Sequence, residues 1–212
     1  MNERHLSFAD RCISELDNAL RVVAARSRAQ RKSPAGTGGG DLRETDRKRV
    51  AKLMRVNHSG EISAQALYRG QALVARDPAL RENLLEAAAE EHDHLAWCQQ
   101  RAEALGGNIS RLAPVWYVGS FAIGMAAGLA GDKASLGFLA ETEKQVSAHL
   151  DSHLKLLPEA DLDSRAILEQ MRDDEIRHGE GAMAKGGAQL PEVIKTTMQL
   201  AAKIMTSTSY RL

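Results

Sequence analysis

Apolar residues recur every three or four positions along most of this chain, which is the spacing of a helix with one buried face. The clearest case precedes Pro158, where Leu136, Leu139, Val146 and Leu150 fall on one stripe. The pattern predicts helices over about residues 6–26, 42–75, 78–105, 133–157, 162–185 and 191–206. The sequence therefore predicts an all-α fold.

Turn-forming residues mark where several of these helices begin and end. Asp77-Pro78 supplies an N-cap residue and a first-turn proline, and Gly106-Gly107 and Gly186-Gly187 are typical of helix ends. Gly60 lies inside a predicted helix, at a position where the helix could bend or break. These signals divide the chain into long helices joined by short turns.

Residues 27–41 are basic and rich in Pro and Gly, which is typical of a flexible linker. The helix before them is then an N-terminal appendage. Asp41-x-x-Glu44 resembles a capping box and marks the start of the main domain. We therefore predict an N-terminal helix and linker over residues 1–40, and one helical domain over residues 41–212.

Composition excludes several classes of function. Lys plus Arg and Asp plus Glu both number 28 among 212 residues, so the chain lacks the electrostatic footprint of a nucleic-acid-binding protein. Two cysteines, Cys12 and Cys98, indicate neither a disulfide framework nor a thiolate zinc site. The N-terminus has no apolar signal core, and its acidic residues argue against a transit peptide. We expect a protein of a bacterium-like cytoplasm.

One arrangement of acidic and histidine residues occurs twice: a lone glutamate is followed about thirty residues later by Glu-x-x-His. Residues at i and i+3 stand on one helical face, so each Glu and His pair can bind the same ion. A four-helix bundle that holds two metals requires this set of ligands. The candidate ligands are Glu61, Glu91, His94, Glu143, Glu175 and His178.

Inward-facing carboxylates are costly, because a charge removed from water loses its solvation. Two divalent cations would neutralise the four negative charges of four carboxylates. Oxygen ligands with one imidazole per metal suit iron or manganese and differ from the Cys/His sets of structural zinc. A single Glu-x-x-His on a helix is usually a solvated pair, but its duplication on otherwise apolar stripes favours a dimetal site.

Further polar residues lie near these motifs. Glu90 and Asp174 each stand four positions before a motif histidine, where they could accept an imidazole N–H from their own or the partner helix, or simply be surface acids. His58 and His149 could reach substrate or be ordinary core histidines. Tyr68 could donate a hydrogen bond near the metals or be a core aromatic.

Leu112–Ala130 contains nineteen residues without a charge. By length alone this run could span a membrane. A single span would place the two ligand sets on opposite sides of the bilayer, so with an intact site the run is a crossover between two helix pairs. At 1.5 Å per residue it covers about 28 Å, roughly the length of a bundle. We expect one side to contact another subunit or a membrane surface.

Four segments together resemble the demethoxyubiquinone hydroxylases, the 3-demethoxyubiquinol 3-hydroxylases of ubiquinone biosynthesis. The similarity covers about residues 45–212 in order and spacing, and the first 40 residues do not contribute to it. The segments are Asn57-His58-Ser59-Gly60-Glu61, Glu91-His92-Asp93-His94-Leu95, Thr142-Glu143-Lys144-Gln145-Val146 followed by His149, and Arg172-Asp173-Asp174-Glu175-Ile176-Arg177-His178.

This resemblance implies a ferritin-like four-helix bundle with an apolar crossover helix and additional terminal helices. It implies two iron ions per chain, bound by the six candidate ligands, with Glu91 and Glu143 as bridges. The expected reaction is hydroxylation of a polyprenylated demethoxybenzoquinol with O₂. A lipid substrate implies peripheral attachment to the cytoplasmic face of the bacterial cell membrane through about Leu112–Ala130, and homo-oligomers or complexes with other quinone-biosynthesis proteins are possible partners.

Two other classes of function share some of these features. A ferritin-like iron-storage or peroxide-scavenging protein would use the same ligands but has no use for the uncharged run. A membrane-associated helical protein without catalytic activity would carry the Glu and His pairs incidentally. Metal content and co-purified prenylated quinone distinguish the three.

Overall fold

The computed structural model describes residues 7–36 and 41–212, and within these ranges all regular secondary structure is helical. The expectation of an all-α fold is confirmed. Predicted and observed boundaries differ most at the last helix, which ends at residue 209 instead of about 206. The helices in chain order are α1 (Phe8–Ala24), α2 (Glu44–Val74), α3 (Pro78–Ala104), α4 (Ala113–Leu129), α5 (Asp132–Leu156), α6 (Leu162–Ala184) and α7 (Glu192–Ser209).

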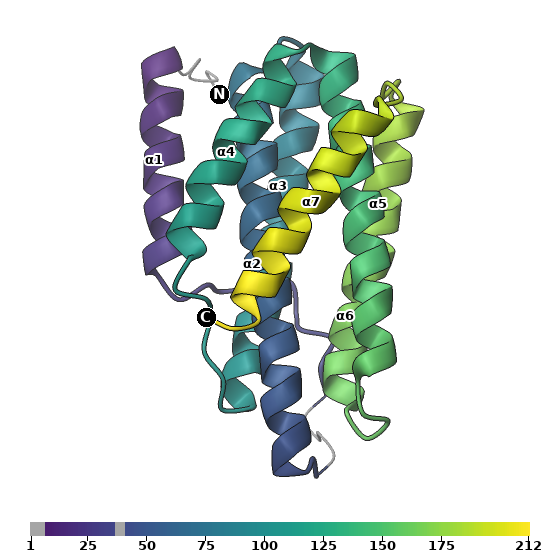
Figure 1. The fold of residues 1–212 in the computed structure, drawn as a ribbon. Coiled ribbons are helices and arrows are strands. Elements are labelled where there is room, and N and C mark those ends of the chain that lie inside the picture. Colours follow the sequence, from purple (N-terminus) through teal and green to yellow (C-terminus); the bar gives the residue numbers. More distant parts are fainter. Residues whose placement is uncertain (1–6, 37–40) are drawn as a thin grey trace.

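Helices α2, α3, α5 and α6 form a ferritin-like four-helix bundle (Figure 1). Short turns join α2 to α3 and α5 to α6, so each pair is antiparallel and packs along its length. Helix α4 lies against α2 and leads into α5, as expected for a crossover between the pairs. Helix α7 crosses the bundle over α2 and α5, and α1 lies beside α2 and α4.

The bundle interior is layered. One apolar cluster includes Met54, Trp97, Leu150 and Ile167, and contains residues from each of the four bundle helices. A second cluster, which includes Leu84, also contains residues from all four helices; it lies later in sequence on α2 and α6 and earlier on α3 and α5, as antiparallel pairing requires. In every helix the candidate ligands fall between these two clusters in sequence. A polar layer is thereby enclosed by apolar side chains at both ends.

The helix ends agree with most of the sequence signals. The Asp77 side chain accepts a hydrogen bond from the Ala79 amide at 2.9 Å, and Pro78 occupies the first turn of α3. The predicted capping box at Asp41-x-x-Glu44 was wrong, because α2 begins at Glu44 and its N-cap residue is Arg43, which makes no side-chain capping bond. Helix α2 also continues through Gly60 without a break.

Residues 25–36, which we call the N-terminal strap, differ from the flexible linker predicted for 27–41. The amide of Ser27 donates to Gln99 Oε1 at 3.3 Å, and the amide of Gln30 donates to Asp93 Oδ1 at 2.6 Å. Ala29 and Ala35 pack on the first apolar cluster. The strap is therefore held against the bundle by specific contacts, while Leu6 and residues 37–40 lie outside the described residues.

Glycines of the apolar run allow α4 to approach α2 closely. A Cβ atom on Gly124 would lie 2.1 Å from the backbone oxygen of Leu67, and one on Gly70 of α2 would lie 2.3 Å from that of Phe121. Neither contact can be relieved by rotating a side chain. Among the described helices, α4 included, none is both long and apolar enough to cross a membrane.

We expect Gly124→Ala to destabilise the protein by about 1–3 kcal/mol, the usual cost of overpacking a tight contact. Gly119→Ala is the matched control on α4, because a Cβ atom there meets nothing within 4 Å. In denaturant unfolding the control should be neutral or slightly stabilising, since alanine favours helix. Equal stability of the two variants would contradict the close packing of α4 on α2.

Candidate metal centre

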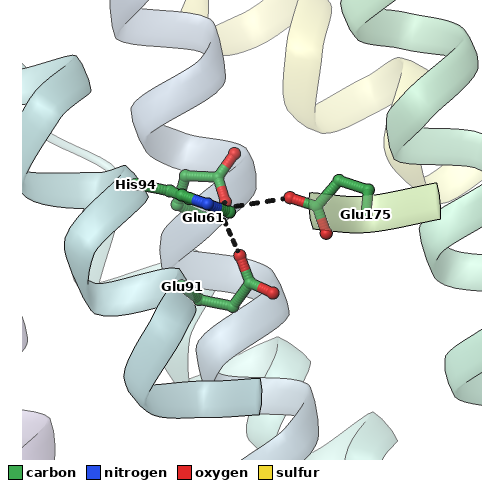
Figure 2. Close-up of side chains that lie close together, drawn as sticks. All are labelled: Glu61, Glu91, His94 and Glu175. Atoms are coloured by element: carbon green, nitrogen blue, oxygen red, sulfur yellow. Dashed lines mark hydrogen bonds and ion pairs between the residues drawn. The ribbon is translucent and has the colours of Figure 1, made fainter. Parts of the chain in front are cut away.

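The structure brings all six predicted ligands together in the polar layer. Helix α2 contributes one glutamate, α5 contributes another, and α3 and α6 each contribute a Glu and His pair from successive turns. Figure 2 shows four of these side chains pointing toward one another from α2, α3 and α6. The six residues are Glu61, Glu91, His94, Glu143, Glu175 and His178, and all are buried except His178, whose side chain is 9% exposed.

The six side chains form two groups, each of which could hold a metal ion. The first consists of Glu61, Glu91, His94 and Glu175, whose ligand atoms lie within 4.8 Å of one another. His94 Nδ1 is 3.0 Å from Glu91 Oε2, 3.2 Å from Glu175 Oε1 and 3.7 Å from Glu61 Oε2. One imidazole nitrogen thus faces three carboxylates.

The second group has the same composition. It contains Glu91, Glu143, Glu175 and His178, again with ligand atoms within 4.8 Å. His178 Nδ1 lies 3.5 Å from Glu91 Oε1, 3.7 Å from Glu143 Oε1 and 3.7 Å from Glu175 Oε2. The duplication seen in the sequence is therefore a duplication in space, which argues against incidental Glu and His pairs.

Glu91 and Glu175 belong to both groups. Each turns one carboxylate oxygen toward His94 and the other toward His178. The structure favours Glu175 over the expected Glu143 as the second bridge, because Glu143 belongs to the second group alone. The shared glutamates are the two of the Glu-x-x-His motifs, and the lone glutamates each complete one group.

The donor atoms fit a pair of metal ions. Buried carboxylate oxygens of all four glutamates lack a hydrogen-bond partner among the described residues, including both oxygens of Glu175. His178 Nδ1 is likewise without one. Buried polar atoms are normally paired, so a cluster of unpartnered acceptors at one point indicates an absent cation.

The pKa shifts of these residues indicate how bound protons balance the negative charge of the cluster when no metal is bound. Burial raises the pKa of Glu61 and of Glu143 well above the usual value. Burial alone would lower the pKa of His178, but Glu143, Glu175 and Glu91 raise it to about 12. The pKa of His94 is likewise raised despite burial, with Asp174 the largest contributor. Without metal, protons supply the positive charge that the carboxylates require.

Each imidazole also has a carboxylate behind it, from the opposite helix pair. His94 Nε2 lies 3.0 Å from Asp174 Oδ2, and His178 Nε2 lies 3.2 Å from Glu90 Oε2. Both acids therefore approach the histidine of the partner helix, Asp174 through a hydrogen bond and Glu90 through a close contact without hydrogen-bond geometry. Such contacts fix which nitrogen faces the metal.

The other predicted residues occupy different environments. Tyr68 is fully buried and donates to Glu143 Oε1 at 2.5 Å, so it is both a core aromatic and a neighbour of a ligand. His58 is buried outside both groups, and burial lowers its pKa to about 4. His149 packs against His153 with ring centroids 4.0 Å apart. Neither His58 nor His149 joins the ligand set.

A mostly apolar cavity of about 700 Å³ reaches the ligand cluster. Residues of α2, α4, α5 and α7 line it, and Glu61 is part of its wall. Val115 and Ile123 of the predicted crossover contribute to its apolar surface, and His149 and Asn57 are among its polar residues. The cavity connects the uncharged run to the first ligand group.

The family model for ubiquinone biosynthesis protein COQ7 matches residues 48–209 of this chain. The chain belongs to this family. All six ligand positions fall within the matched family residues, whereas the N-terminal strap precedes them.

Relatives of the same family match almost the whole chain. The protein is 56% identical to the 3-demethoxyubiquinol 3-hydroxylase of Ralstonia pickettii (strain 12J), over 96% of this chain and 99% of that protein. It is 54% identical to the enzyme of the same name from Polynucleobacter necessarius subsp. necessarius (strain STIR1), over 98% and 100%. A third, from Chromobacterium violaceum, is 54% identical over 95% and 98%.

Sequence reasoning did not identify two residues that contact this site. Asp93, inside the first Glu-x-x-His motif, accepts hydrogen bonds from the strap, and Arg31 of the strap extends to Asp93 and Asp174. Arg31 lies outside the family match and in a stretch without helical periodicity. The only signal for Arg31 was its charge within a Pro- and Gly-rich segment, and that composition predicted a flexible linker.

The raised pKa values predict that the metal-free protein loses stability at alkaline pH. The stabilisation from His178 is fully present below its ordinary pKa of 6.5 and is lost as pH rises toward about 12. Glu61 and Glu143, whose pKa values are also raised, act in the same direction. The melting temperature of the metal-free protein should therefore fall between pH 6.5 and about pH 9.

His178→Asn is the variant that tests this pH dependence, because an amide cannot bind the proton. Its melting temperature should decline less steeply over the same pH range than that of the parent protein. A parent protein whose melting temperature is flat across this range would contradict the proposed protonation of the cluster.

Proposed function

We propose that this protein is a di-iron monooxygenase that hydroxylates 3-demethoxyubiquinol with O₂. The observation that carries the proposal is the pair of buried Glu₃His groups that share Glu91 and Glu175. The names of relatives more than half identical over nearly their full length support the substrate. The mostly apolar cavity at Glu61 supports a lipid-like ligand.

The composition of the ligand set favours iron. Each group offers three carboxylates and one imidazole, a hard donor set that suits iron or manganese. Iron, when bound here, would supply the redox chemistry that activates O₂, which side chains cannot provide. Two divalent ions also carry the four positive charges that four carboxylates require.

The protein's own residues would then bind and orient the quinol. The cavity gives an apolar path to Glu61, and Asn57 and His149 are polar groups in its wall that could hydrogen-bond the ring hydroxyls. Burial lowers the pKa of His149, so it is a neutral hydrogen-bonding group at physiological pH. The apolar lining excludes water from the reacting end.

Peripheral attachment to the cytoplasmic face of the bacterial cell membrane accompanies this proposal. A prenylated quinol resides in the bilayer, and the two helices that border the cavity, α4 and α7, expose large apolar side chains. Val118 and Leu129 of α4 are 68% and 61% exposed, and Leu200 of α7 is 60% exposed. Exposed apolar side chains on the two helices that border the cavity favour contact with a membrane surface.

The reaction is tested with purified, iron-loaded, reduced protein and the demethoxy precursor of ubiquinone. We expect about two irons per chain and a product that carries one oxygen atom from ¹⁸O₂. Glu175→Gln should lower activity by about a hundredfold or more, because even outer contacts of metal ligands are worth 10–100-fold.

Glu169→Gln is the matched control, because Glu169 is exposed on the same helix and should tolerate the change. Iron binding without conversion of the precursor, together with rapid peroxide consumption, would instead identify a ferritin-like scavenger. Absence of bound iron would refute the metal centre itself.

Membrane attachment is tested by sedimentation with vesicles of phosphatidylethanolamine and phosphatidylglycerol. Val118→Asp should reduce binding to the vesicles several-fold, because the carboxylate would lose its solvation when α4 enters the membrane surface. Leu162→Asp is the control, since Leu162 is 62% exposed but lies at the start of α6. Unchanged binding of Val118→Asp would exclude α4 from the membrane contact.

A further inference from the structure

The N-terminal strap binds the outer side of the ligand cluster through one aspartate. The amides of Gln30 and Arg31 both point at the Asp93 carboxylate, at 2.6 Å from Oδ1 and 3.3 Å from Oδ2. The Arg31 Nε atom adds a third hydrogen bond, 3.0 Å to Asp93 Oδ2. Asp93 immediately precedes His94, so the strap is attached next to a candidate ligand.

The guanidinium of Arg31 connects two helices of the bundle. While Nε contacts Asp93 of α3, Nη1 donates to Asp174 Oδ2 of α6 at 2.9 Å. The group also lies over the Trp97 ring, 4.9 Å from its centroid, and the Trp97 indole N–H donates to the Arg31 carbonyl oxygen at 3.4 Å. A planar guanidinium can make these contacts together, whereas a lysine ammonium is a single point of charge.

Asp174 transmits this contact to His94. The same Oδ2 atom that accepts from Arg31 lies 3.0 Å from His94 Nε2, and Arg31 Nη2 lies 3.0 Å from that nitrogen as well. Because His94 Nδ1 faces three carboxylates, a metal-binding neutral imidazole carries its proton on Nε2 and donates it to Asp174. Arg31 Nη2 is itself a donor, so its contact with Nε2 is not a hydrogen bond in this state, and Arg31 acts on His94 through Asp174. Arg31 holds the oxygen that receives this hydrogen bond.

The two halves of the centre differ at this point. The carboxylate behind His178 belongs to Glu90, whose side chain is 32% exposed, whereas the Asp174 side chain is 6% exposed. Arg177, of the same helix as His178, contacts both carboxylates, Glu90 Oε2 at 2.8 Å and Asp174 Oδ1 at 2.9 Å, and is itself 56% exposed. Arg31 approaches Glu90 no closer than 3.9 Å. The strap therefore supports the His94 half directly.

We propose that Arg31 is a positioning residue that orients His94 through Asp174 and so makes the His94 half the tighter of the two metal sites. The inference rests on the proposed dimetal centre but goes beyond it, because Arg31 lies outside the residues that the family model matches. The strap is then a part of the active site that comes from outside the four-helix bundle.

Titration of the metal-free, full-length protein with Co²⁺ tests this proposal, with the visible absorption of bound Co²⁺ as the readout. The parent protein should bind two ions in two resolvable steps. Arg31→Gln should weaken the tighter step by about 10–100-fold, the usual effect of losing an outer contact of a ligand. The weaker step should change little. The melting temperature of the metal-free protein should fall, because Asp93 and Asp174, whose side chains are each 6% exposed, lose a charged partner.

Two further variants separate positioning from general attachment of the strap. Arg31→Lys retains the charge and one donor, so it should recover part of the lost affinity. Arg26→Gln removes a different contact of the strap, that of Arg26 to Glu103, and should leave both steps unchanged.

The outcomes distinguish this inference from the proposed function. A parent protein that binds no Co²⁺ would refute the dimetal centre on which both depend. Two ions bound equally well by the parent protein and by Arg31→Gln would overturn the role of Arg31 alone. Equal weakening by Arg31→Gln and Arg26→Gln, or no recovery in Arg31→Lys, would reduce the strap to a structural attachment and overturn the proposal as well.

Discussion

Four carboxylates buried at one level of a helical bundle are the feature on which the rest of this structure depends. Such a layer is unstable as four free anions, because burial removes their solvation and they repel one another. Protons on Glu61, Glu143 and both imidazoles can compensate them, as the raised pKa values indicate. Two divalent metals would compensate the same charge and would also satisfy the unpartnered oxygens. The apolar clusters on either side of the layer then provide the stability that the polar layer lacks.

The arrangement of the helices follows from the need to bring two ligand sets to one point. Antiparallel pairing places the lone glutamate of each half beside the Glu and His pair of the same half, and the crossover α4 brings the second pair alongside the first. Glycines such as Gly124 allow α4 to pack directly on the α2 backbone. The same helix lines the cavity that reaches Glu61, so the path to the ligand cluster is built from the element that connects the two halves.

Much of this structure could be predicted from the sequence because helices convert spacing into position. Glu61, Glu143 and the two Glu-x-x-His motifs were identified by spacing alone, since the helical repeat fixes which face each side chain occupies. Spacing did not identify the bridging pair, because Glu143 and Glu175 are equivalent in periodicity. They differ only in how α5 and α6 pack across the bundle. Arg31 could not be found either, since an irregular segment has no period from which the direction of a side chain follows.

The central claim is that the six side chains bind two metal ions with Glu91 and Glu175 between them. Anomalous diffraction at the iron edge, from crystals of the iron-loaded protein, tests it most directly. The account predicts two peaks about 3.5–4 Å apart, one beside Nδ1 of His94 and the other beside Nδ1 of His178. Each shared glutamate should place one carboxylate oxygen at one ion and its other oxygen at the second ion. A single peak, or two peaks bridged by Glu143 instead of Glu175, would contradict it.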